Sequence, residues 1–258
     1  MADVEGDFIA YDLLTTDPMK SGAFYESVLG WTIQKPQVVD PDRKIERRAV
    51  TSADGHTIAG IMSLADDDTT SPGWLGYIAV TDVDATVAAI EASAGKLHVP
   101  PMSVDGVGRF AMVADPQGVV FYVMRREDDR AATGFSLDDA GRCSWNELAT
   151  TDRQSAFEFY TNLLGWADGG VMPMGPAGDY QFLSQNGSAI GAIMTRADGM
   201  PAQWLFYFRV ADIDAALAKV EGKGGTVVHG PAEVPGGDSI LVCLDPTGAG
   251  FGLVGKRG

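Results

Sequence analysis

The sequence LLTTDPMKSGAFYESVLGW, residues 13–31, determines the fold, because it returns as LATTDRQSAFEFYTNLLGW at residues 148–166. The offset of 135 residues is constant from the Thr-Thr-Asp at the start to the Leu-Gly-Trp at the end. A second repeat pairs Asp-Pro-Gln-Gly at 115–118 with Asp-Pro-Thr-Gly at 245–248, at an offset of 130. Self-similarity of this kind indicates a duplicated domain, so each functional hypothesis has to be checked in two places.

The first copy predicts a strand, a helix and three further strands. Residues 8–14 are typical of a strand, and Asp17 followed by Pro18 marks the start of a helix. Apolar residues then recur at helical spacing until Gly30, which ends the helix. The three further strands are expected at 31–34, 45–51 and 57–64.

This βαβββ pattern occurs four times along the chain. The predicted modules cover about 7–65, 73–125, 142–196 and 202–255. Residues 127–141 have no sustained periodicity and are expected to link a first domain, 1–126, to a second domain, 142–258. The predicted fold class is therefore α+β, with two modules in each domain.

Composition excludes several classes of partner. The 258 residues carry a formal charge of −16 and no Lys/Arg-rich run, which argues against nucleic acids and anionic membranes. We expect no secretory signal, because the start of the sequence has no cationic region followed by an apolar one, and no membrane span, because no apolar run approaches about 20 residues. Two cysteines, Cys143 and Cys243, favour a reducing cytoplasm, where we expect both as buried thiols.

The order of these motifs resembles the vicinal oxygen chelate superfamily, which includes glyoxalase I, bleomycin-resistance proteins, fosfomycin-resistance enzymes and extradiol dioxygenases. The resemblance rests on the Thr-x-Asp…Phe-Tyr…Leu-Gly-Trp segments, on Thr-Asp-Val-Asp at 81–84 with Ala-Asp-Ile-Asp at 211–214, and on the two Asp-Pro-x-Gly turns. It covers nearly the whole chain. It implies that the two modules of each domain form an open, barrel-like cup.

The resemblance also implies a divalent metal in catalytic members, held by His, Gln or Glu at fixed strand positions. In this chain those positions carry Ala10, Tyr77, Tyr122, Trp145, Tyr207 and Gly252. The strands 56–63 and 188–195 contain no carboxylate, and His56 is their one ligand-type residue. We therefore expect metal-free cups without a cofactor, which argues against a metal-dependent glyoxalase or extradiol dioxygenase.

Two carboxylates are the main polar candidates. Asp12 and Glu147 lie two residues beyond Ala10 and Trp145, so strand alternation directs them to the same face. With aromatic neighbours they predict a pocket for a flat or cationic small molecule, whose ligand-binding candidates are Asp12, Tyr77, Tyr122, Trp145, Glu147, Tyr207 and Arg209. Alternatively, the carboxylates accept internal hydrogen bonds from backbone or tyrosine groups, or Glu147 pairs with Arg209.

The remaining distinctive residues favour structural roles over chemistry. His98, His229 and His56 are expected at the surface, at strand edges or beside a turn. The Phe-Tyr pairs of the first helices, with Trp31 and Trp166, are expected in the core. No Ser/His/Asp order with a nucleophile elbow and no Gly-rich phosphate loop occurs.

These observations favour a cytoplasmic protein that binds a small organic molecule, by sequestration or sensing. The alternative is a glyoxalase-like lyase, isomerase or hydroxylase, with Glu147 or Asp12 as general base and a tyrosine as acid, or with a metal site in another register. A third hypothesis is an interaction protein whose own side chains fill both cups. A monomer and a homo-oligomer are both compatible with the sequence.

Overall fold

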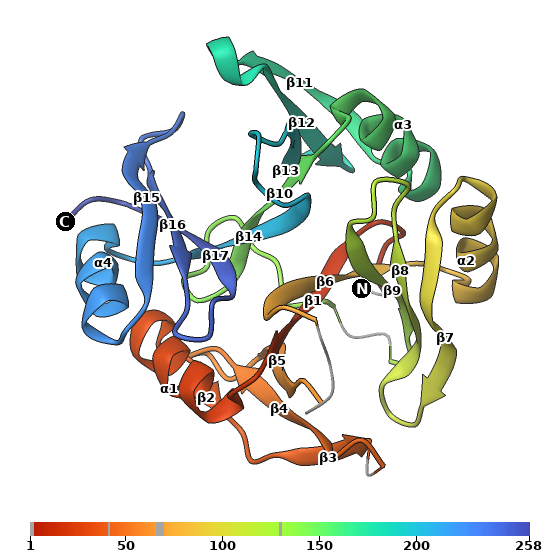
Figure 1. The fold of residues 1–258 in the computed structure, drawn as a ribbon, viewed down its shortest axis with the longest axis horizontal. Coiled ribbons are helices and arrows are strands. Elements are labelled where there is room, and N and C mark those ends of the chain that lie inside the picture. Colours follow the sequence, from red (N-terminus) through yellow and green to blue (C-terminus); the bar gives the residue numbers. More distant parts are fainter. Residues whose placement is uncertain (1–2, 41, 66–69, 129–130) are drawn as a thin grey trace. The chain divides into compact units, whose positions relative to one another are not determined.

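The computed structural model describes residues 3–40, 42–65, 70–128 and 131–258 (Figure 1). Within them, the strands belong to one nine-stranded and one eight-stranded sheet, neither closed on itself. Each sheet mixes parallel and antiparallel pairs. The predicted α+β class, with four βαβββ modules, is confirmed.

The modules follow one another in the chain. The first contains β1 (Phe8–Thr15), α1 (Pro18–Leu29), β2 (Thr32–Ile33), β3 (Gln37–Asp40), β4 (Ile45–Thr51) and β5 (Thr57–Ser63). The second contains β6 (Gly73–Ala79), α2 (Val83–Ala92), β7 (Lys96–Val104), β8 (Gly108–Ala114) and β9 (Val120–Arg126). The third contains β10 (Cys143–Thr150), α3 (Arg153–Leu164), β11 (Ala167–Pro173), the short 3-10 helix η1 (Gly175–Ala177), β12 (Asp179–Gln185) and β13 (Ser188–Thr195). The fourth contains β14 (Gln203–Arg209), α4 (Ile213–Gly222), β15 (Thr226–Glu233), β16 (Ser239–Leu244) and β17 (Gly250–Gly255).

In every module the first strand pairs in parallel with the last. The helix supplies the crossover that a parallel pair needs, whereas the following strands return through short hairpins. The added strand β3 was not predicted, because exposed Val38 and Val39 follow no inside–outside alternation there.

Sequence signals set the helix boundaries as expected. Asp17 and Asp152 cap α1 and α3 by accepting the amides of Lys20 and Ser155, each at 3.0 Å. Gly30 and Gly165 end these helices in the left-handed conformation, with φ of 70° at both. An L side chain is strained there, which explains why glycine occupies both positions.

The chain divides into two compact units. Unit 1 comprises Met1–Ile9, Leu75–Ala132 and Trp145–Leu205, so it holds most of the second and third modules. Unit 2 comprises Ala10–Trp74, Thr133–Ser144 and Phe206–Gly258, and holds most of the first and fourth. The domain boundaries expected from the sequence, at 1–126 and 142–258 with a linker between them, stay a prediction.

Each unit has an aromatic core around the tyrosine of the repeated segment. In unit 2, Trp74 Nε1 donates to Tyr25 Oη at 2.9 Å, and in unit 1, Trp204 Nε1 donates to Tyr160 Oη at 3.3 Å. Burial raises the pKa of both tyrosines well above the ordinary value. The prediction that the Phe-Tyr pairs, Trp31 and Trp166 belong to the core is confirmed, since all are buried.

The Asp-Pro-x-Gly turns also join this packing. In unit 2, Ser21 Oγ donates to Asp245 at 2.9 Å; in unit 1, Tyr160 Oη donates to Asp115 at 3.1 Å. Desolvation raises the pKa of the buried Asp115 carboxyl. In the part of the chain that the structure describes, no helix is long and apolar enough to cross a membrane.

Candidate functional site

A chain of hydrogen bonds joins three side chains in the third module. Trp145 Nε1 donates to Tyr180 Oη at 2.8 Å, and Tyr180 Oη donates to Glu147 Oε2 at 2.7 Å. All three residues are half-buried. Because the indole can only donate, the tyrosine proton is directed toward the carboxylate.

Strand alternation brings these groups together. Trp145 and Glu147 lie two residues apart on β10, and Tyr180 and Phe182 lie two apart on β12. The Phe182 ring contacts those of Trp145 and Tyr180, with centroids at 6.0 and 5.4 Å. Between the two strands, Ala192 of β13 is the Cα partner of both Glu147 and Phe182, and its small side chain leaves room for them. We call Trp145, Glu147, Tyr180 and Phe182 the aromatic–acid cluster.

The first module holds an ion pair in the corresponding place. Arg47 of β4 binds the Asp12 carboxylate through two hydrogen bonds, Nε to Oδ2 at 2.9 Å and Nη2 to Oδ1 at 2.8 Å. Asp12 is fully buried, whereas 32% of the Arg47 side chain is exposed. Paired, planar geometry of this kind is the strongest form of a carboxylate–cation contact.

Gly60 makes this ion pair possible. A Cβ atom added there would lie 2.4 Å from Asp12 Oδ1 and 2.5 Å from Arg47 Nη2, closer than real Cβ contacts. The φ angle of Gly60 is one that any residue can adopt. Glycine is therefore required here only because a side chain would collide with Asp12 and Arg47.

The pairing of the strands shows that the two arrangements are equivalent. Asp12 faces Gly60 across β1 and β5 as Glu147 faces Ala192 across β10 and β13. Arg47 is the partner of Met62 as Tyr180 is the partner of Met194. Each half of the chain thus has a carboxylate on its first strand. The hydrogen-bond donor at the equivalent position differs, since it is the guanidinium of Arg47 in the first half and the phenol of Tyr180 in the second.

The second and fourth modules carry aromatic rings at the candidate positions of their strands. Tyr77 and Tyr122 stack face to face, with centroids at 4.2 Å and an interplanar angle of 4°, and Phe110 meets both edge-on. In the fourth module, the ring of Tyr207 covers its Cα partner Gly252, where an added Cβ would lie 2.2 Å from the ring. All of these positions except Phe110 are ones that the sequence marks as candidates, and the structure pairs Tyr77 with Tyr122 and Tyr207 with Gly252.

Arg209 forms an ion pair within unit 2. Its Nη2 donates to Asp238 Oδ2 at 3.0 Å, and Lys256 lies 2.8 Å from the other oxygen of that carboxylate. Lys256 and then Arg209 hold the pKa of Asp238 below its ordinary value. Within their own units, Arg209 thus binds Asp238 and Glu147 accepts from Tyr180, and the Glu147–Arg209 pair considered from the sequence stays a prediction.

The positions at which the family holds a metal do not fit one. Tyr77 and Tyr122 stack on each other, the Tyr207 ring covers Gly252, and the Trp145 indole is a donor bound to Tyr180. Among the described residues, no group of three or more His, Cys, Asp or Glu could hold a metal ion. A hard or borderline cation needs several converging nitrogen and oxygen donors, and an indole, a glycine and two tyrosines stacked on each other do not supply such a set.

The weaker candidates lie where we expected them. His56, His98 and His229 are exposed. Cys143 and Cys243 are buried and are not joined by a disulfide. Burial raises the pKa of the Cys243 thiol to about 12, so it is not an activated nucleophile.

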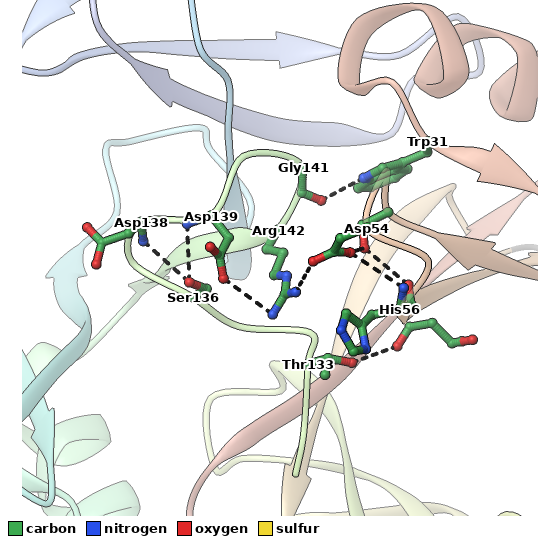
Figure 2. A network of polar contacts seen from close by, with 11 residues as sticks. Trp31, Asp54, His56, Thr133, Ser136, Asp138, Asp139, Gly141 and Arg142 are labelled. Carbon is green, nitrogen blue, oxygen red and sulfur yellow. Dashed lines mark hydrogen bonds and ion pairs between the residues drawn. The ribbon is translucent and has the colours of Figure 1, made fainter. Parts of the chain in front are cut away.

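The segment before β10 is fixed to the β4–β5 hairpin in unit 2 (Figure 2). The Arg142 guanidinium binds the Asp54 carboxylate, and Thr133 Oγ1 donates to the carbonyl of Thr57 at 3.0 Å. Hydrogen bonds from Ser52 and then from Arg142 lower the pKa of Asp54 to about 2. The segment makes specific contacts although its sequence has no periodicity.

Arg47, Tyr180 and Phe182 were missed by reasoning from the sequence. The signal for Tyr180 and Phe182 was present in the alternation of β12, which puts both on one face. Nothing in the sequence alone brings β12 near β10, or Arg47 near Asp12, because that needs the pairing of non-adjacent strands.

Sequence comparison identifies the family. The model for the "Glyoxalase/Bleomycin resistance protein/Dioxygenase superfamily" matches residues 8–123 and 142–253. The chain belongs to this superfamily. The expected resemblance is thus confirmed, with one match over each half of this glyoxalase-superfamily protein.

Similar proteins share nearly its whole length. "Putative glyoxylase CFP32" of Mycobacterium bovis is 30% identical over 246 residues, which cover 94% of this chain and 92% of that protein. "Anthracycline biosynthesis protein DauV" of Streptomyces sp. is 29% identical over 260 residues, covering 96% and 92%.

Solved structures share the fold. The Mn(II)-bound glyoxalase of Novosphingobium aromaticivorans has a TM-score of 0.66 at 19% identity, covering 99% of this chain and 83% of that one. The 2,3-dioxygenase LapB of Pseudomonas sp. KL28 has a TM-score of 0.68 at 14% identity, covering 100% and 94%. At these identities the likeness concerns the fold alone.

Proposed function

We propose that this glyoxalase-superfamily protein binds a small, flat organic molecule at the aromatic–acid cluster without using a metal. The observation that carries the proposal is the hydrogen-bonded chain from Trp145 through Tyr180 to Glu147, at 2.8 and 2.7 Å. It fixes an aromatic surface beside a hydroxyl and a carboxylate, all half-buried. Specific ligand sites combine apolar rings with a few oriented polar groups in this way.

The cluster favours a planar ligand that carries hydroxyl groups. Trp145 and Phe182 offer ring surface for stacking. The Glu147 carboxylate accepts hydrogen bonds, and the Tyr180 hydroxyl both accepts and donates them. The similarity to the Streptomyces anthracycline biosynthesis protein supports a polycyclic aromatic ligand, so a hydroxylated anthraquinone is the first probe to use.

Tryptophan fluorescence provides a test of the proposal. Trp31, Trp74, Trp166 and Trp204 are buried, whereas Trp145 is half-buried and reports on its own cluster. Titration with a hydroxylated anthraquinone in chelator should quench a saturable fraction of the emission. The Trp145→Phe variant should lose that fraction, and a wild-type protein that shows no saturable quenching would refute the proposal.

Catalysis without metal is the second candidate, and the Tyr180–Glu147 hydrogen bond favours it. A carboxylate beside a phenol supplies a general base and a general acid within one hydrogen bond. Such a site suits a lyase or isomerase reaction on the same ligand, because both can proceed by proton transfer alone. The Glu147→Gln variant should abolish turnover; if turnover in chelator is unchanged in this variant, Glu147 is not the base.

We also propose a cellular compartment for the protein and a measurement of its oligomeric state. A cytoplasmic protein is supported by two buried thiols, Cys143 and Cys243, that form no disulfide. A protein that acts by sequestration or sensing requires a small-molecule ligand as its partner. Sedimentation of the purified protein, with and without ligand, distinguishes a monomer from a homo-oligomer.

A further inference from the structure

A cavity of about 390 Å³ lies in unit 1, away from the aromatic–acid cluster. It is bounded by α2, by the Asp-Pro-Gln-Gly turn and by α3. Its lining combines apolar and polar side chains and contains one carboxylate, that of Glu158, and no cationic group.

Because the chain is duplicated, the residues that line the cavity in unit 1 can be compared with their equivalents in unit 2. There Lys20, on the first turn of α1, extends its ammonium group to the carbonyl of Pro246, with Nζ to O at 3.2 Å. At the offsets of the two repeats, the residues equivalent to Lys20 and Pro246 are Ser155 and Pro116, which both line the cavity. Ser155 cannot reach like a lysine, and among the described residues no group donates to the Pro116 carbonyl.

The side chains that line the cavity in unit 1 and those at the equivalent positions in unit 2 carry opposite charges. At the same offsets, Lys219 and Lys223 of the fourth module correspond to Ala89 and Ser93 of the cavity. Conversely, Glu158 of the cavity corresponds to an alanine in unit 2. Unit 2 thus carries its own ammonium groups on these positions, whereas unit 1 replaces them with small residues and adds a carboxylate.

Gln117, which lines the cavity, has an unsatisfied acceptor. Gln117 Oε1 is buried and has no hydrogen-bond partner in the described part of the chain. A buried acceptor without a donor is unfavourable, so a ligand that donates hydrogen bonds is favoured here. The equivalent Thr247 is instead satisfied, since its hydroxyl donates to Asp245 at 2.7 Å.

We propose that this cavity is a binding site for a small primary alkylammonium ion. The ligand ammonium takes the place that Lys20 Nζ occupies in unit 2 and donates to the carbonyl of Pro116. Glu158 supplies the opposite charge, and Phe159 with Leu163 contacts the alkyl chain. The site is separate from the aromatic–acid cluster, so it does not depend on the function proposed there.

Calorimetric titration with 1,4-diaminobutane tests this site. Wild-type protein should bind one equivalent, and Ser155→Lys, which installs the lysine of unit 2, should weaken binding by at least about tenfold. Glu158→Gln should weaken it as well. The matched control is Ala218→Lys, which adds the same charge to an exposed position of α4 and should bind like wild type.

Three results of the titrations with the diamine would overturn the proposal. They are no binding to the wild-type protein, equal binding to Ser155→Lys, and equal weakening by Ala218→Lys, which would indicate attraction to the acidic surface as a whole. Thermal unfolding of each variant verifies that it is folded. Titration with 1-butanol, which lacks the charge, should show no binding, and binding equal to that of the diamine would also contradict an ammonium site.

Discussion

Gly60 gives the sharpest test of how the carboxylate sites are built. Replacing it by alanine adds one methyl group, which would lie 2.4 Å from Asp12 Oδ1 and 2.5 Å from Arg47 Nη2. One of the two charged groups must move. Because Asp12 is fully buried on strand β1 and Arg47 is the longer side chain, we expect the guanidinium to be displaced.

The expected cost follows from separating the Asp12 carboxylate from the Arg47 guanidinium. Removing one member of a buried ion pair costs about 3–5 kcal/mol, but water reaches the Arg47 side chain, 32% of which is exposed, and reduces this. Alanine in place of glycine in a strand returns about 0.5–1 kcal/mol. We therefore expect Gly60→Ala to lower the free energy of unfolding by about 2–3 kcal/mol.

Urea unfolding followed by circular dichroism measures this change. Gly73→Ala is the matched control, since Gly73 also lies in a strand and a Cβ there meets nothing within 4 Å. In an Asp12→Ala, Arg47→Ala background the cost of Gly60→Ala should largely vanish. If Gly60→Ala is no worse than the control, or costs as much without the ion pair, the steric reasoning is wrong.

Three further predictions concern other sites. Tyr180→Phe removes the hydroxyl that links Trp145 to Glu147, so it should weaken binding of a hydroxylated anthraquinone about tenfold in a fluorescence titration, with unfolding little changed. Gly252→Ala puts a methyl group 2.2 Å from the Tyr207 ring and should cost about 1–3 kcal/mol in urea unfolding. The pKa of Asp54 is about 2 in the folded state against 3.8 ordinarily, so its carboxylate stabilises the fold fully above the ordinary value. This contribution is lost as pH falls through about 2, and the stability difference between wild type and Asp54→Asn, measured by urea unfolding, should shrink in that window.

The sequence predicted the scaffold because its signals are local. Asp17 and Gly30 mark both ends of α1 through cap chemistry that needs no tertiary contact. The duplication then repeated each signal in the second half. The strand β3 was not predicted, because Val38 and Val39 are exposed and its sequence shows no alternation of apolar and polar residues.

The candidate site was predicted only in part. Alternation along β10 correctly put Trp145 and Glu147 on one face, since that relation lies within a strand. The partners Tyr180 and Arg47 come from strands that are not adjacent in sequence to their carboxylates, so composition and spacing could not assign them. The position of Arg209 was found but its partner Asp238 was not, for the same reason.

Metal-free binding at the aromatic–acid cluster is the proposal on which the function of this protein depends. The decisive experiment is calorimetric titration of chelator-treated protein with a hydroxylated anthraquinone, in parallel with the Glu147→Gln variant. We expect saturable binding to the chelator-treated wild type and binding at least about tenfold weaker to the variant. Binding that appears only after a divalent metal is added, or that is equal in the two proteins, would show that the cluster is not such a site.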